Sequence, residues 1–298
     1  MLDFRIETFL CVCRHMNFTK AAQELRITQP GVSQHIRYLE NYYENRLFCY
    51  SNKKLTLTQA GIDLRDTMIS VKNDSMHLKN AMKEHAAGKK ILKFGATLTV
   101  GEFYLPEKIK EYVRNNPQTQ LDFTIGNTQE LLTMLEDGKI DFAIIEGYFE
   151  KSGYESRTIS RESYVPVCAM DYPLENVADI RELLSHHLLV REDGSGTKEI
   201  LERYLTEQGY RLSDFTKVSV INSIHVIKQL AETGYGISFL YEIAVKKELE
   251  EGNLRIIPIK DFALTHEFNY IWRKNSVFSD FYLEIYDTLI RENHKIVK

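Results

Sequence analysis

The sequence predicts an α/β protein with an all-α-rich head, and three observations lead to that fold class. The first sixty residues carry short helical patterns, one long helical pattern follows, and beyond residue 90 strand-like and helix-like segments alternate. The chain has 298 residues, of which 43% are hydrophobic and 27% are charged. This composition is typical of globular domains, and the length favours two or three compact units over a single core.

Three short helices are expected in the head. An apolar stripe predicts a first helix that ends near His15. Thr19 is the expected N-cap of a second helix over residues 20–25, and Thr28 is the expected cap of a third helix that runs to about Asn41. The second and third helices are separated by only a few residues, as in a helix-turn-helix.

The third helix has two different faces. Val32, Ile36 and Leu39 recur at spacings of four and three and so face inward. The outward side chains are polar: Gln29, Ser33, Gln34, His35, Arg37 and Tyr38. Amides and guanidinium groups on such a helix can read base edges in a DNA major groove, while hydroxyls and helix N-termini hold phosphates. Periodicity alone allows equally a small helical bundle with a solvated polar face.

A β-hairpin is expected after the third helix. Leu47-Phe48 can anchor one strand, Asn52-Lys53-Lys54 forms a turn, and Leu55-Thr56-Leu57 alternates as a second strand. The two lysines at the tip are suited to a wing that touches a phosphate backbone. Residues 1–57 have a net charge of +3 against −7 for the remainder, which fits a nucleic-acid contact confined to one end. We therefore expect a winged helix-turn-helix over 1–57.

Residues 58–88 are expected to form one long linker helix, capped by Thr58. Its apolar residues alternate at spacings of four and three, as in the seam of a two-stranded coiled coil; they are Leu64, Met68, Val71, Ser75, Leu78 and Met82. The alternative is a helix that lies on its own domain. The narrow seam favours pairing of two chains.

Residues 89–298 read as two α/β lobes. Strand and helix patterns alternate, which predicts parallel sheets with helices on both faces. We assign 89–163 and 266–298 to lobe 1 and 164–265 to lobe 2, so that the chain crosses between them twice. Three loops after strands are rich in hydrogen-bond donors: Thr97–Gly101, Asn127–Gln129 and Glu192–Thr197. Taken singly, each suits an ordinary N-cap; together they suit an anion bound between the lobes.

The head resembles the signature of LysR-type transcriptional regulators. The matching residues are Asn17-Phe18-Thr19-x-Ala21-Ala22-x-x-Leu25, Gln29-Pro30-x-x-Ser33-x-x-Ile36-x-x-Leu39-Glu40, Leu47-Phe48 and Leu57-Thr58-x-Ala60-Gly61. Tyr50 departs from the pattern, because the family usually has arginine there. The lobes resemble the two-lobed type 2 periplasmic-binding fold. Gly95-Ala96-Thr97-x-Thr99-x-Gly101-Glu102 and Arg191-Glu192-x-Gly194-Ser195-Gly196-Thr197 are similar to the effector clefts of regulators of sulfur assimilation and carbon fixation.

This resemblance implies a DNA-binding regulator that is controlled by a small, anionic effector. The expected DNA contacts are Thr28, Gln29, Pro30, Ser33, Gln34, Arg37, Lys53 and Lys54. The expected effector contacts are Thr97, Thr99, Thr128, Gln129, Ser195, Thr197 and His225, while Arg191 pairs either with the ligand or with Glu192. The expected partners are double-stranded DNA and further copies of the chain in a homodimer or homotetramer. RNA polymerase is a further candidate partner, and no cofactor or metal is expected.

The sequence offers little support for other classes. Ser195-x-x-Lys198 matches a motif of penicillin-binding enzymes, but the companion motifs of that family do not occur in the chain. Cys11, Cys13, Cys49 and Cys168 have no metal-ligand spacing, so free thiols are expected. No run of apolar residues is long enough for a membrane span, and no export signal is evident, so we expect a cytoplasmic protein. A solute-binding protein would need no head, and a DNA-binding protein whose lobes only oligomerise remains a further alternative.

Overall fold

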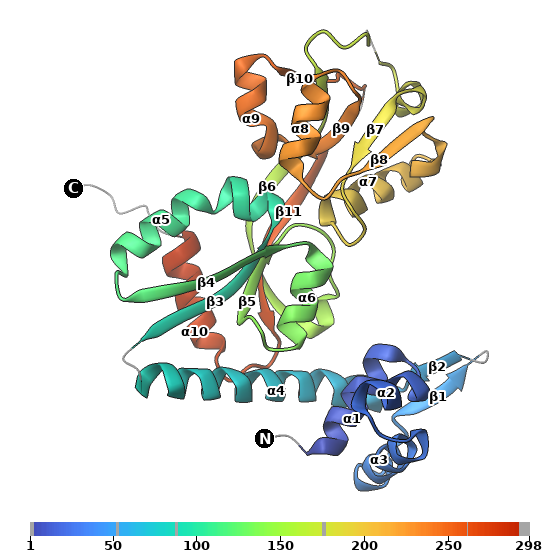
Figure 1. Cartoon of the computed structure of the whole chain (residues 1–298), viewed down its shortest axis with the longest axis vertical. Helices are drawn as coiled ribbons and strands as arrows, with labels where there is room; N and C mark the ends of the chain where they lie inside the picture. The colour runs from blue at the N-terminus through green and yellow to red at the C-terminus, as the bar shows by residue number, and fades with distance from the viewer. Residues whose placement is uncertain (1–2, 52–53, 87–88, 175–176, 261, 292–298) are drawn as a thin grey trace.

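A computed structural model describes residues 3–51, 54–86, 89–174, 177–260 and 262–291. Figure 1 shows a head, a long helix beneath the lobes, and two lobes stacked on each other. The helices are α1 (Phe4–His15), α2 (Phe18–Leu25), α3 (Gln29–Tyr42), α4 (Gln59–Ala86), α5 (Pro106–Asn115), α6 (Thr128–Glu136), α7 (Gly196–Glu207), α8 (Ile224–Glu232), α9 (Glu242–Glu251) and α10 (Ser279–Tyr286). The strands are β1 (Phe48–Ser51), β2 (Lys54–Leu57), β3 (Lys90–Thr97), β4 (Thr119–Gly126), β5 (Phe142–Ile145), β6 (Tyr154–Ala169), β7 (His187–Val190), β8 (Lys217–Val220), β9 (Ile237–Tyr241), β10 (Leu254–Ile256) and β11 (Leu264–Arg273).

The head is a three-helix unit with a two-stranded wing. Thr28 caps α3 as predicted, because its hydroxyl accepts from the Gly31 N–H at 3.2 Å. The predicted cap of α2 is wrong by two residues: the Asn17 side chain accepts from the Lys20 N–H at 2.9 Å, and α2 begins at Phe18. An asparagine carbonyl caps a helix at least as well as a threonine hydroxyl, so Asn17, which comes before Thr19, can start the helix.

The wing is an antiparallel hairpin joined to the helices by apolar contacts. Phe48 pairs with Leu57 at its base. Leu47 is 1% exposed and lies in the core of the head with Phe9 and Val32. Burial of these side chains holds the wing at a set position relative to α3.

The long helix α4 has one face on its own chain and one face open. Leu64 belongs to the core of the head, so its assignment to the pairing seam is wrong. Ser70, Asn73 and His77 lie against lobe 1; the Ser70 hydroxyl donates to Lys274 O at 2.7 Å, and the His77 ring lies 2.8 Å from an Asp141 oxygen. One side of α4 therefore lies on its own chain, as the second alternative predicts. Pairing of two chains through another side of the helix stays a prediction.

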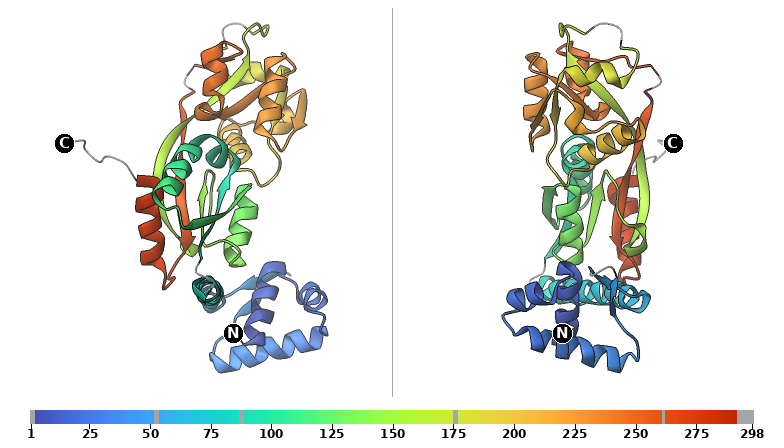
Figure 2. Two further views of the ribbon diagram at one scale, coloured as in Figure 1. Left: turned by 60° about the vertical axis from the view of Figure 1, so that its left-hand side comes forward. Right: turned by 90° about the vertical axis from the view of Figure 1, so that its right-hand side faces the viewer.

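The other face of α4 is exposed in the single chain. Val71, Leu78 and Met82 are 44%, 51% and 67% exposed. We call these three residues the apolar stripe of α4. Figure 2 shows α4 crossing below lobe 1.

One nine-stranded sheet runs through both lobes in the order β4-β3-β5-β11-β6-β9-β7-β8, with β10 on β6. The β3 strand is parallel to β4 and β5, and β7 is parallel to β8 and β9, as predicted. The expectation of wholly parallel sheets is wrong for the crossing strands, since β11 is antiparallel to β5 and to β6. A strand that returns from the other lobe enters the sheet from the opposite end.

Helices cover both faces of the sheet in lobe 1. Phe142 and Ile144 of β5 pack in one core with α5 and α10, whereas Ala143 and Ile145 pack in another with α6. This alternation along one strand is the expected period of two. None of the helices in the described ranges is long and apolar enough to cross a membrane.

Candidate DNA-binding face and effector cleft

The outward face of α3 carries most of the predicted DNA contacts. Thr28, Gln29, Pro30, Gln34 and Arg37 are exposed, and Ser33 is half-buried. The Gln29 side-chain amide donates to the Ser33 hydroxyl at 3.0 Å. This bond holds the amide and the hydroxyl together at the N-terminal end of α3, from which recognition helices contact base edges.

His35 is not part of this face, contrary to the sequence-based expectation. Its Nδ1 lies 3.0 Å from the Thr8 hydroxyl of α1, and its ring meets Phe4 edge-on at 4.9 Å. Tyr38 is exposed as expected, and the Arg5 guanidinium lies 3.7 Å from the centre of its ring. His35 therefore packs α3 against α1.

An open hollow of about 820 Å³ lies between α3 and the wing. Gln29, Arg37, Arg46, Tyr50 and Lys54 are among the side chains that line it. Lys53 lies outside the described residues. Arg46 is a cation that the sequence-based selection missed; it is 80% exposed and lies 2.9 Å from a Glu40 oxygen. Arg46 lines the same hollow as Tyr50, which stands where the sequence signature of the head usually has an arginine.

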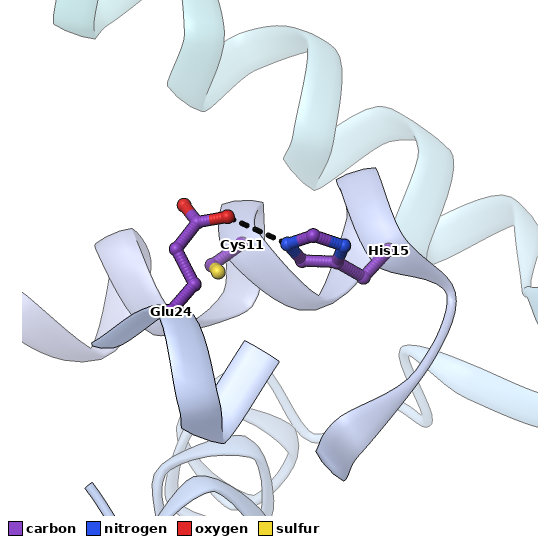
Figure 3. A group of neighbouring side chains, drawn as sticks. All are labelled: Cys11, His15 and Glu24. Carbon is purple, nitrogen blue, oxygen red and sulfur yellow. Dashed lines mark hydrogen bonds and ion pairs between the residues drawn. The ribbon is translucent and has the colours of Figure 1, made fainter. Parts of the chain in front are cut away.

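Figure 3 shows the one group in the described chain with metal-ligand geometry, formed by Cys11, His15 and Glu24. Their ligand atoms lie within 4.8 Å of one another. Cys11 and His15 are one helical turn apart, and α2 brings Glu24 to them. All four cysteines are free thiols, as expected. Arg14 also binds the Glu24 carboxylate, and the His15 ring is 2.6 Å from it. A cation already neutralises the acid, so we interpret the group as an ion-pair network that joins α1 to α2.

Five of the predicted effector residues converge in the structure. Thr97, Thr99, Thr128, Ser195 and Thr197 are each less than 5% exposed. The first three come from lobe 1 and the last two from the start of α7 in lobe 2. Ser195 is the N-cap residue of α7, but its side chain makes no capping hydrogen bond. The sequence-based expectation that these hydroxyls meet between the lobes is consistent with this geometry.

At their centre lies Glu146, which the sequence-based selection missed. Glu146 directly follows β5 and is 1% exposed. Thr97 donates to one carboxylate oxygen, and Thr99 and Thr197 donate to the other at 3.1 and 3.2 Å. Burial raises the pKa of Glu146, and the hydrogen bond from Thr97 and the charge of Arg191 oppose that rise. The sequence did carry one signal for Glu146: an acidic residue that directly follows an apolar strand.

The two lobes touch through glycine backbone beside Glu146. A Cβ on Gly196 would lie 2.5 Å from Glu146 O and 2.8 Å from the Gly147 Cα. Gly147 has φ +99°, a conformation that favours glycine. The Thr128 hydroxyl donates to Glu146 O at 2.8 Å, which holds this segment against α6.

The remaining predicted residues lie at the edge of the cluster or away from it. Arg191 pairs with Glu192 through two bonds of 2.8 and 2.9 Å, which is the second of the two expected alternatives. Gln129 is exposed, and its N–H donates to Gly194 O across the lobes at 3.4 Å. His225 is exposed on α8 and, among the described residues, makes no hydrogen bond to the cluster.

Fold and site together define a class of protein: a transcriptional regulator with a helix-turn-helix head and a two-lobed effector-binding domain. Residues 5–62 match the family model of the bacterial regulatory helix-turn-helix protein, lysR family, and residues 85–288 match the LysR substrate binding domain. The chain belongs to the LysR family of transcriptional regulators, which is a family of regulators and not of enzymes.

Relatives and solved structures agree with this assignment. The chain is 30% identical to the HTH-type transcriptional regulator CysL of Bacillus subtilis over 97% of both chains. It is 27% identical to the RuBisCO operon transcriptional regulator of Acidithiobacillus ferrooxidans, over 90% of this chain and 86% of that one. The regulatory domain of CcmR from Synechocystis PCC6803, solved in complex with 2-PG, matches with a TM-score of 0.61 at 19% identity, covering 70% of this chain and 99% of that one. The structural match supports the fold.

Proposed function

We propose that α3 reads DNA sequence through Gln29 and Ser33. The observation that carries this proposal is the paired amide and hydroxyl at the exposed N-terminal end of α3. Thr28, Pro30, Gln34 and the cations that line the hollow then position the duplex through its phosphates. The apolar stripe of α4 pairs two chains, and association of two such pairs gives a tetramer. We retain the division into 1–57, 58–88 and 89–298 for this regulator.

Operator binding is tested by fluorescence anisotropy on genomic fragments selected by footprinting. Gln29→Ala should weaken the selected operator by about tenfold and random duplex hardly at all, since a base contact is worth about 1–3 kcal/mol. Lys54→Ala should weaken binding to the operator and to random duplex equally. It should also reduce the slope of log affinity against log salt concentration by about one. Equal losses on all duplexes for Gln29→Ala would refute its base-reading role.

We further propose that the lobes bind a small anionic metabolite through Thr97, Thr99, Thr128, Ser195 and Thr197, with Gln129 and His225 at its edge. The complex of CcmR with 2-PG supports an acid-bearing ligand. Ligand binding that prefers one lobe arrangement changes the spacing of the heads on DNA. Thr97→Val should abolish the response of DNA binding to an effector while it leaves DNA affinity intact. An unchanged response would exclude this cleft.

The remaining parts of the proposal concern partners and compartment. Regulation of transcription requires access to the chromosome, so the cytoplasm is the compartment that this function requires in a bacterial cell. RNA polymerase is a candidate partner for the same reason. Run-off transcription from the selected operator, with and without the chain, tests that contact. Analytical ultracentrifugation of Leu78→Glu tests pairing through α4, because a charge on the stripe should shift the chain toward monomer.

A further inference from the structure

The donors of the effector cleft are already used by the chain itself. Thr97 and Thr99 in lobe 1 and Thr197 in lobe 2 all donate to the Glu146 carboxylate. A hydroxyl has a single proton, so a threonine that donates to Glu146 cannot donate to a bound anion at the same time. The site expected to receive an acid group is therefore occupied by one.

Glu146 also joins the lobes. Its carboxylate belongs to the segment after β5, and its bond of 3.2 Å from Thr197 reaches the first turn of α7. Gly147 and Gly196 bring the two backbones into contact at the same place. A ligand that bound both groups of threonines would hold the lobes together in the same way.

Arg191 is a buried cation whose charge acts on Glu146, and one of its nitrogens has no hydrogen-bond partner among the described residues. Arg191 is 2% exposed, and its Nη1 has no hydrogen-bond partner among the residues that the structure describes. Its other guanidinium nitrogens bind Glu192. A guanidinium group offers five N–H donors, and a buried one without a partner is costly. The cleft therefore retains a donor for a further acid group.

We propose that Glu146 is an internal ligand of the effector cleft, whose carboxylate holds the lobes together in the place that the acid group of the effector takes. This inference rests on the proposed effector cleft. The effector is then a small molecule with a carboxylate or tetrahedral oxyanion that takes over the threonine hydroxyls from Glu146. Two anions compete for these donors, so Glu146 sets which ligands enter and how tightly they bind.

The first test removes the Glu146 carboxylate by substitution and replaces it with acetate from solution. Glu146→Ala deletes a CH₂–COO⁻ group, which is acetate less one hydrogen. Addition of 100 mM acetate at constant ionic strength should raise the melting temperature of the variant by about 5 °C, as expected for a dissociation constant of about 1 mM. Wild type should respond far less, because its own carboxylate competes with acetate for the same donors. Glu107→Ala is the matched control, since Glu107 is exposed on α5.

A larger anion of the same charge checks that the rescue depends on shape. Trimethylacetate should not stabilise Glu146→Ala, because its three methyl groups exceed the space that the deleted group leaves. Equal shifts in the three proteins, or no shift in Glu146→Ala, would overturn the proposal. If Glu146→Ala does not fold without acetate, recovery of folded protein by acetate alone is the same readout.

The second test keeps the shape and removes the charge. In calorimetry, Glu146→Gln should bind sulfate, inorganic phosphate or phosphoglycolate at least about tenfold more tightly than wild type. The reason is that the repulsion between the Glu146 carboxylate and the bound anion is gone. A purely structural role for Glu146 gives equal or weaker binding in the variant, and that result would overturn the proposal.

The two proposals fail in different ways. The acetate experiment needs neither DNA nor a known effector. Rescue by acetate without any operator binding would therefore leave the internal ligand standing and refute the proposed reading of DNA by α3. An effector response in wild type, together with anion affinity unchanged in Glu146→Gln, would refute the internal ligand alone.

Discussion

Gly196→Ala should open the contact between the two lobes. The added Cβ would lie 2.5 Å from Glu146 O, 2.8 Å from the Gly147 Cα and 2.9 Å from the Thr128 hydroxyl. Two of these three neighbours are backbone atoms, so no side chain can rotate to make room. Gly196 itself has no positive φ, and the substitution therefore tests the close approach without adding backbone strain.

The magnitude follows from the distances. Ordinary carbon contacts lie near 3.5 Å, so the lobes must separate by about 0.7–1 Å. The bond from Thr197 to Glu146, now 3.2 Å, would then pass the limit for a hydrogen bond. Overpacking costs about 1–3 kcal/mol, and the lost bond to a charged group about 1.5–3 kcal/mol. Alanine gains at most about 1 kcal/mol in the helix. The net loss is about 3 kcal/mol.

Thermal unfolding followed by circular dichroism measures this loss. A domain of this size loses about 2–4 °C per kcal/mol, so the melting temperature of the effector domain should fall by about 6–12 °C. Gly209→Ala is the control: it has φ +83° but nothing within 4 Å of the new Cβ, so only the backbone cost of about 1–2 kcal/mol applies. A melting temperature for Gly196→Ala within 2 °C of wild type would refute the close contact.

Two further predictions concern a buried charge and a half-buried thiol. Lys228→Ala should cost about 3 kcal/mol in chemical denaturation, since Lys228 binds Glu248 at 2.7 Å with both side chains nearly buried, and the acid would be left unpaired. Lys246→Ala, on an exposed helix face, should cost less than about 0.5 kcal/mol, and equal losses would contradict the argument. Burial raises the pKa of Cys13 from 9.0 to about 12, so the folded chain holds that proton longer than the unfolded chain, and the associated stability is lost as the pH rises from 9 through 12. At pH 8 Cys13 should have about a thousandfold less thiolate than an ordinary thiol. Peptide mapping after alkylation should find exposed Cys49 modified first; equal rates would contradict the raised pKa of Cys13.

Much of the architecture followed from local pattern. The Thr28 cap and the four-and-three spacing of Val32, Ile36 and Leu39 predicted α3 because both signals lie within one helix. The error at the start of α2 arose because Asn17 and Thr19 can both cap a helix, and only the fold selects Asn17. The outward placement of His35 was wrong because the side chain is polar but has a partner, Thr8, on another helix.

The sequence by itself determined the helix-turn-helix motif, the alternation of strands and helices, and the hydroxyl-rich loops at strand ends, since each depends on residues near in the chain. Only the tertiary structure decided that β11 runs antiparallel beside β5, that one side of α4 packs on lobe 1, and that Glu146 lies among the threonines of both lobes. Residues 97, 146 and 197 are far apart in the chain, and no local periodicity encodes which of them meet. The packing of the two lobes decides that they meet. A carboxylate can be buried there because hydrogen bonds from several converging donors offset its desolvation.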